Sequence, residues 1–223
     1  MKNTNDNLST KEKLLAAGVK LFSRHGYEST TSRLIAETAG TNVASMAFHF
    51  GNKEEFYYAV LNHVADKVRS DYSHFVNKVQ CAHDGKTPTP ERAWELIEEY
   101  VEQILSIVNG TNQKGSFDDN DVLNLLFREQ IVPAKGVRPI TNVLCKESEA
   151  LLNILLMDFW QKETPQVAAI ISRSITGAII SFGEHPTFIR RALGKEDDAD
   201  LEDEIWDTLR DFILNSIKAY TPA

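Results

Sequence analysis

The histidines and cysteines of the chain are the residues whose types could support metal chemistry. His63 and His74 lie eleven residues apart, about three turns of a helix, so both would face the same side. Three turns separate them by about 16 Å, and zinc holds nitrogen ligands at about 2.1 Å, so the two cannot share an ion. We expect reduced thiols and no metal. A site built from Cys81, His83 and Cys145 is the metal-sensing alternative.

Sequence patterns of catalysis are missing from the chain. It has no Gly-rich phosphate loop and no G-x-S-x-G, H-E-x-x-H or C-x-x-C motif. We therefore expect neither an enzyme nor a bound cofactor.

Composition and charge narrow the class of protein further. The 223 residues are 42% hydrophobic and 25% charged, as in an ordinary globular protein. The net charge is −8, yet residues 1–80 carry ten basic against eight acidic side chains, so an anionic polymer would bind the N-terminal part. The polar N-terminus lacks a signal-like apolar segment, and no run of about 18 uninterrupted apolar residues is present. These features predict a cytoplasmic protein without a membrane partner.

Helix signals follow one another along the chain, whereas strand patterns are nearly absent. Capping residues, prolines and glycines predict short helices over 10–26, 30–40 and 42–50, and a helix of about 42 Å from Asn52 to about Gln80. Later helices are predicted near 90–108, 120–132, 139–161, 165–182 and 200–220. The sequence thus predicts an all-α fold.

The helices predicted at 165–182 and 200–220 have apolar faces that a partner could cover. The first is apolar almost all round, so one buried stripe does not account for it. We expect a homodimer in which both helices pair with their copies as a four-helix bundle; a monomer core is the alternative. The predicted interface consists of Ile171, Ile175, Ala178, Phe182, Ile205, Leu209, Phe212, Ile213 and Ile217.

The first three predicted helices have the proportions of a helix-turn-helix unit, with a turn at Gly40-Thr41. Particular residue pairs add to this pattern: Ala16-Ala17, Leu21-Phe22, Gly26-Tyr27, Thr30-Thr31, Ile35-Ala36, Ala39-Gly40 and the ending Phe50-x-x-Lys53-Glu54. With them, residues 9–61 resemble the N-terminal domain of the tetracycline-repressor (TetR) family of transcriptional regulators. The resemblance implies a DNA-binding three-helix bundle over 1–51 and a helical ligand-sensing and dimerisation domain over 52–223.

In such a unit the start of the third helix would reach base edges in the major groove. Asn42 could pair with adenine, while Val43 and Ala44 could contact thymine methyl groups. Phosphate contacts would come from Thr30, Thr31, Arg33, Ser45, His49 and Lys53. The chain departs from the family at Ala47-Phe48-His49, where a tyrosine-rich run is expected. Ala47 cannot donate to a phosphate, and His49 could replace a tyrosine hydroxyl.

The C-terminal part resembles the CecR-like subgroup through Leu126-Phe127-Arg128-Glu129-Gln130 and Gly177 to Phe182. The resemblance to the TetR family implies that this part senses a small-molecule effector, which changes the spacing of the two DNA-reading units. Aromatic residues could line its cavity, with Arg128 or Glu129 adding polarity; the alternative is that they are ordinary core residues. The candidates are Trp94, Tyr100, Phe117, Phe127, Arg128, Phe159 and Trp160.

Together these features predict a ligand-responsive regulator, more readily a repressor than an activator, that binds a palindromic operator in double-stranded DNA as a homodimer. The alternative from another class is a dimeric small-molecule-binding or interaction protein without specific DNA binding. Salt-dependent binding to specific DNA separates the two.

Overall fold

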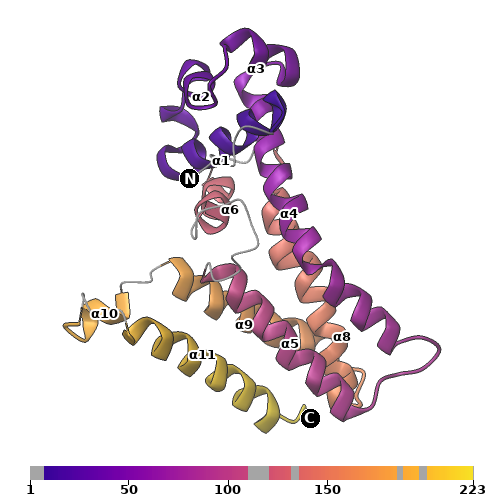
Figure 1. Ribbon diagram of the computed structural model, residues 1–223. Coiled ribbons are helices and arrows are strands. Elements are labelled where there is room, and N and C mark those ends of the chain that lie inside the picture. The colour runs from indigo at the N-terminus through magenta and orange to yellow at the C-terminus, as the bar shows by residue number, and fades with distance from the viewer. Residues whose placement is uncertain (1–7, 110–120, 132–135, 185–187, 196–199, 223) are drawn as a thin grey trace. The chain divides into compact units, whose positions relative to one another are not determined.

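The computed structural model describes residues 8–109, 121–131, 136–184, 188–195 and 200–222, and the regular elements in these ranges are helical (Figure 1). This confirms the all-α prediction. The chain divides into two compact units. The described part of the first unit comprises residues 8–69, 121–131 and 136–143, and that of the second comprises the remainder. The chain therefore leaves the first unit, returns to it and leaves it again.

The first unit opens with α1 (Thr10–Ser29), α2 (Ser32–Thr38) and α3 (Val43–Phe50). Ser9 caps α1: its hydroxyl accepts from the Glu12 N–H, and the Glu12 carboxylate accepts from the Ser9 N–H at 2.7 Å. Gly26 has a φ of 77° and interrupts α1 close to where the sequence predicts its end. The local signals thus set the lengths of these three helices.

An aromatic core joins these helices to α4 (Lys53–Ala82). The Phe22 ring lies 4.8 Å from the Tyr57 ring and 5.9 Å from the Phe56 ring, measured between centroids. Gly18 allows this close packing, because a Cβ there would lie 2.6 Å from Cγ2 of Val60. A larger residue at position 18 would force α1 and α4 apart.

The first unit also contains a helix from later in the chain, α6 (Asp121–Ile131), which packs against α1 (Figure 1). The Ser23 hydroxyl donates to the Asp121 carboxylate, and both residues are buried. Near the C-terminal end of α6, the buried Glu129 carboxylate accepts from the Thr141 N–H at 2.5 Å, at the short helix α7 (Pro139–Thr141). Polar contacts therefore hold α6 in this unit.

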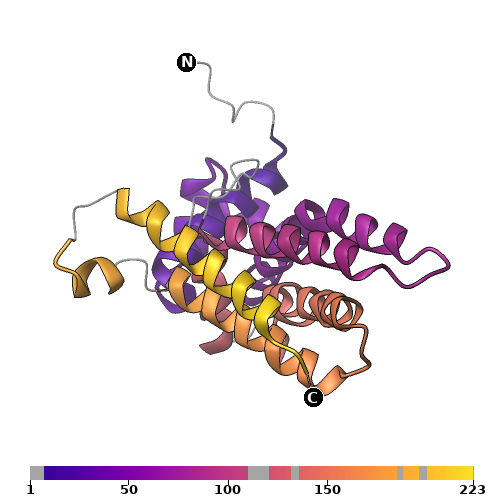
Figure 2. The same cartoon turned by 90° about the horizontal axis from the view of Figure 1, so that it is seen from below.

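The second unit is a bundle built on α5 (Pro90–Val108), α8 (Ser148–Trp160) and α9 (Pro165–Glu184), which pack against one another. Thr89 caps α5 and Pro90 is its first residue, as the sequence predicts. The helix expected over 139–161 is instead divided, with a π-helical segment at Asn142–Glu147 before α8. The chain ends with α10 (Phe188–Ala192) and α11 (Asp200–Ala219), and α11 lies alongside α9 (Figures 1 and 2).

The helix α9 is both long and apolar. Its segment Pro165–Gly183 has a mean hydropathy of 1.3, which by length and composition would be enough to cross a membrane. The sequence pattern does not predict this, because the segment is not an uninterrupted run of apolar residues. In the structure, however, α9 packs against α8 and α5, with Ala168, Ile175 and Ile179 buried. It is a core helix of the second unit that keeps further apolar residues on its surface.

Candidate DNA interface

The start of α3 is fixed by Asn42. Its side-chain oxygen Oδ1 accepts from the Ser45 N–H at 2.8 Å and from the Ser45 hydroxyl at 3.2 Å. A bidentate pair with adenine needs that oxygen as an acceptor. Asn42 would therefore have to leave the cap to read adenine as the sequence analysis expects, and Ser45 already donates its hydroxyl proton within the helix.

Most of the exposed residues of α3 are apolar. Val43, Ala44 and Ala47 are exposed, and Phe48 is 85% exposed, whereas Met46 is buried and fixes the helix against the unit. Sequence reasoning placed Val43 and Ala44 on the exposed side of α3 but passed over Phe48. The signal that could have found it is its spacing, two residues after the buried Met46 and one turn after Ala44.

The predicted phosphate-binding residues at α2 differ in accessibility. Thr30 is fully buried, and its hydroxyl donates to the Gly26 carbonyl at 2.7 Å, so it fixes the end of α1 and cannot reach a phosphate in this structure. Thr31 is exposed and caps α2 by accepting from the Leu34 N–H. Arg33 is 84% exposed and pairs with Glu37 at 3.0 Å, an interaction that solvent weakens. Thr31 and Arg33 thus stay accessible to a ligand.

Two further predicted residues lie near the junction of α3 and α4. His49 is exposed on α3, and its ring meets that of Phe48 edge to face, with centroids 5.1 Å apart. Lys53 is half-buried at the start of α4, and its ammonium group lies 4.2 Å from the centroid of the Tyr27 ring. This cation–π contact holds Lys53 in place while its charge remains.

Comparisons with known proteins agree with this arrangement. The sequence model described as "Bacterial regulatory proteins, tetR family" matches residues 14–60, which span α1 to the first part of α4. The HTH-type transcriptional dual regulator CecR of Shigella flexneri is 29% identical over 178 residues, covering 77% of this chain and 74% of CecR. The chain carries the helix-turn-helix segment of the TetR family of transcriptional regulators over residues 14–60 and is similar to the regulator CecR over most of its length. It is a DNA-binding helix-turn-helix protein of a non-enzymatic family and a distant homologue of CecR, as both predicted resemblances implied.

Other relatives of this TetR-family chain are more distant. The probable HTH-type transcriptional regulator YttP of Bacillus subtilis is 22% identical over 149 residues, covering 67% of this chain and 64% of YttP. The structure of the regulator FadR from Bacillus subtilis in complex with stearoyl-CoA has a TM-score of 0.61 at 14% identity, covering 93% of this chain and 97% of FadR. A mutant of HlyIIR gives 0.60 at 19% identity, with 96% and 98% covered. These structures show that the fold is shared.

The residues expected to line an effector cavity fall into separate groups. Phe127 and Arg128 belong to the first unit, where Arg128 donates to the backbone of α1. In the second unit, Trp94 packs against Phe159 with centroids 5.1 Å apart, and Trp160 packs against Tyr220 at 5.6 Å. Phe117 lies outside the described residues.

Tyr100, another of the expected lining residues, belongs to a polar cluster in the second unit. It is fully buried, and its hydroxyl donates to the Ser148 hydroxyl at 3.4 Å. Burial raises the pKa of Tyr100 to about 12, which the Ser148 and Thr176 hydroxyls oppose. The Tyr72 ring lies 6.3 Å from that of Tyr100, and its buried hydroxyl has no hydrogen-bond partner among the residues that the structure describes.

A mostly buried carboxylate extends the cluster. Glu149 pairs with Arg173 on α9 at 2.9 Å. Burial raises the pKa of Glu149, and Arg173 opposes the rise. The cluster brings polar side chains together inside the helical bundle of the second unit.

The metal-sensing alternative is not supported by the geometry of His83. One ring nitrogen lies 2.7 Å from the Val79 carbonyl, and the other lies 2.7 Å from the Asp158 carboxylate, so both are engaged within the protein. Cys81 is exposed whereas Cys145 is buried. Among the residues that the structure describes, no group of three or more His, Cys, Asp or Glu side chains is placed to hold a metal ion.

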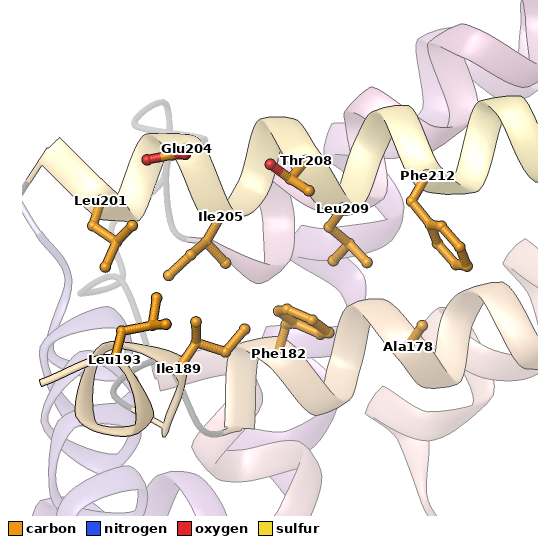
Figure 3. A pocket seen from close by; sticks show the side chains of 10 residues that line it. All are labelled: Ala178, Phe182, Ile189, Leu193, Leu201, Glu204, Ile205, Thr208, Leu209 and Phe212. Atoms are coloured by element: carbon orange, nitrogen blue, oxygen red, sulfur yellow. The ribbon is translucent and has the colours of Figure 1, made fainter. Parts of the chain in front are cut away.

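The expected dimer residues are divided between core and surface. Ile175, Leu209, Ile213 and Ile217 are buried within the single chain, so they already stabilise its own fold. Phe212 is 68% exposed. It lines an apolar groove of about 430 Å³ in which Phe182 of α9 faces Ile205 and Leu209 of α11 (Figure 3). The groove and Phe212 are therefore the part of the expected interface that a second subunit could cover.

Proposed function

We propose that this TetR-family regulator is a cytoplasmic homodimeric repressor that binds a palindromic operator and leaves it when a small-molecule effector binds. In this proposal residues 1–51 contact DNA, and residues 52–223 sense the effector and form the dimer. The observation that carries the proposal is the presentation of α3, because buried Met46 holds the helix while its opposite face stays open. A helix held this way can enter the major groove.

The apolar surface of the second unit supports the dimer. Phe212 and the groove between α9 and α11 expose apolar side chains that a monomer would leave in water. Two copies related by a two-fold axis would cover the same surface on both subunits and present two α3 helices to a palindrome.

Two observations support the binding of an effector. The second unit contains the polar cluster around Tyr72 and Tyr100, and the structure of FadR, which has a similar fold, is a complex with stearoyl-CoA. The helix α4 contributes residues 53–69 to the first unit and 70–82 to the second. A shift of α4 on effector binding would therefore change the position of α3, which is the shared element that coupling between two sites requires.

The test begins with duplexes selected from a random-sequence library by the purified full-length protein. We expect enrichment of a palindrome, one dimer per duplex, and affinity that falls steeply with salt because phosphate contacts release counterions. A reporter gene behind the selected palindrome should be repressed. Equal weak binding to all duplexes would favour the alternative, a dimeric binding protein without specific DNA recognition, and activation of the reporter would contradict the repressor role.

A further inference from the structure

Phe48 is more exposed than any other large apolar side chain in the described residues. Its exposed fraction is 85%, although it lies on α3, the helix proposed to contact DNA. A phenyl ring in water is unfavourable, and single exposed apolar residues are nevertheless common on protein surfaces. The position of Phe48 on the helix therefore decides what the exposure means.

The ring stands at the centre of the exposed face of α3. Phe48 follows the buried Met46 by two residues, about 200° around the helix, so it points almost directly away from the core. Ala44 lies one turn before it, and Ala47 is its other small neighbour on this face. The phenyl ring thus projects beyond the methyl side chains on one side of it, while the His49 ring lies against it on the other.

The polar side chains at the start of α3 are already hydrogen-bonded within the helix, so the apolar side chains are the ones available to contact bases. Asn42 and Ser45 are occupied by the helix cap, while Val43, Ala44 and Phe48 have exposed apolar side chains. In the major groove the thymine C5 methyl group is the feature of a base pair that an apolar side chain recognises. Phe48 cannot donate or accept hydrogen bonds to the other bases.

We propose that Phe48 is a specificity-determining residue that contacts a thymine methyl group in each half of the operator. This inference rests on the proposed DNA binding and adds a base preference to it. His49, whose ring meets that of Phe48, and Lys53 at the start of α4 would contact the phosphates beside this thymine.

The experiment uses the full-length protein and the palindrome that the wild type enriches from a random library. Each thymine is replaced in turn by deoxyuridine, which removes the methyl group and keeps the base pair. For the wild type, we expect one such replacement in each half-site to weaken binding several-fold. Phe48→Ala should bind the unmodified palindrome about tenfold more weakly, as expected for losing part of the burial of a phenyl ring.

The deciding measurement combines the Phe48→Ala substitution in the protein with the deoxyuridine replacement in the DNA. In Phe48→Ala the deoxyuridine replacement should no longer matter, while Phe48→Leu should keep part of the methyl dependence. Ile131→Ala serves as a matched control, because Ile131 is 80% exposed in the same unit but lies on α6. Thermal unfolding of both variants should match the wild type, since neither side chain is buried.

Two other outcomes are distinguishable. If the wild type enriches a palindrome but Phe48→Ala keeps both its affinity and its dependence on the methyl group, the role of Phe48 is wrong and the proposed function stands. If the wild type enriches no duplex, the proposed function fails and this inference fails with it. Loss of binding to all duplexes alike in Phe48→Ala would show a general contact and overturn the thymine assignment.

Discussion

Nε of Arg128 on α6 donates to the main-chain carbonyl of Ser23 on α1 across 2.9 Å. The Nη2 group of the same guanidinium donates to the Arg24 carbonyl at 3.0 Å. These carbonyls lie near the C-terminal end of α1, where a cation is favourable to the helix dipole. Arg128 therefore fastens α6 to α1, and a role in an effector cavity stays a prediction.

We expect Arg128→Gln to lower the free energy of unfolding by about 1.5–3 kcal/mol, because the variant cannot make the hydrogen bonds from a charged donor to α1. Urea titration followed by circular dichroism measures the change. Arg92→Gln is the control: Arg92 pairs with Glu95 on an exposed helix surface and should cost well under about 1 kcal/mol. Equal effects of the two variants would contradict a structural role for Arg128.

Glu129 gives a pH dependence of stability. Burial raises the pKa of its carboxyl group, while hydrogen bonds from Thr141 and the Ile140 N–H oppose the rise. The folded state then holds the proton more tightly than the unfolded chain, so the free energy of unfolding falls as pH rises through the raised pKa. Relative to Glu129→Gln, wild type should lose stability as the pH rises above 4.5, the ordinary pKa of the carboxyl group, and through the raised pKa of the folded state. A difference that stays constant across this range would refute the prediction.

The two buried tyrosines of the second unit should respond in opposite ways to loss of their hydroxyl groups. Tyr72→Phe removes a buried hydroxyl that has no partner in the described part of the chain and should raise the free energy of unfolding by about 1 kcal/mol. Tyr100→Phe removes the donor to Ser148 and should lower it by about 1 kcal/mol. Denaturant titrations of both variants measure this. If an effector uses the Tyr72 hydroxyl, Tyr72→Phe should also weaken the response of DNA binding to that effector.

Lys53 should contribute affinity for DNA without contributing sequence preference. Lys53→Gln should weaken binding to selected and random duplexes alike, and reduce the slope of log K against log salt by about 0.9 for each phosphate that the lysine neutralises. Fluorescence anisotropy over a range of salt concentrations measures the slope. Lys86→Gln removes a charge of the same sign from the second unit and should leave the slope unchanged. A change in sequence preference with Lys53→Gln would contradict the phosphate assignment.

The exposed Phe212 is a sensitive position for the proposed dimer. Phe212→Glu would place a charge in an apolar interface, so we expect mainly monomers in sedimentation equilibrium, together with loss of palindrome binding. Ile131→Glu, a similarly exposed position in the first unit, should stay dimeric. A dimeric Phe212→Glu protein would move the interface away from this surface.

Much of the fold could be predicted from the sequence because its signals are local. The helix ends lie within a few residues of their predicted positions. The residues that set them are Ser9 with Glu12, Thr89 with Pro90, and Gly26. The docking of α6 on α1 could not be predicted this way, because Arg128 and Ser23 are 105 residues apart. The π-helical segment before α8 also has no simple local signal.

The sequence predicts which segment forms the candidate DNA interface, but it predicts less well which residues of that segment are accessible. The pattern from Ala16 to Glu54 identifies the helix-turn-helix, which the family comparison confirms. Whether a polar side chain is accessible depends on contacts that the pattern does not show: Thr30 is buried against Gly26, and Asn42 caps its own helix. The roles of the individual residues, the division at residue 51 and the dimer interface stay predictions.

The path of the chain through the first unit limits how this protein can be cut or recombined. Because α6 and α7 return to that unit after residue 120, a fragment ending near residue 69 would lack Asp121, Arg128 and Glu129 and would uncover the side of α1 that α6 covers. A chimera that replaces the helix-turn-helix unit of this protein should therefore take two stretches of sequence from the donor, one ending near residue 69 and one containing α6 and α7.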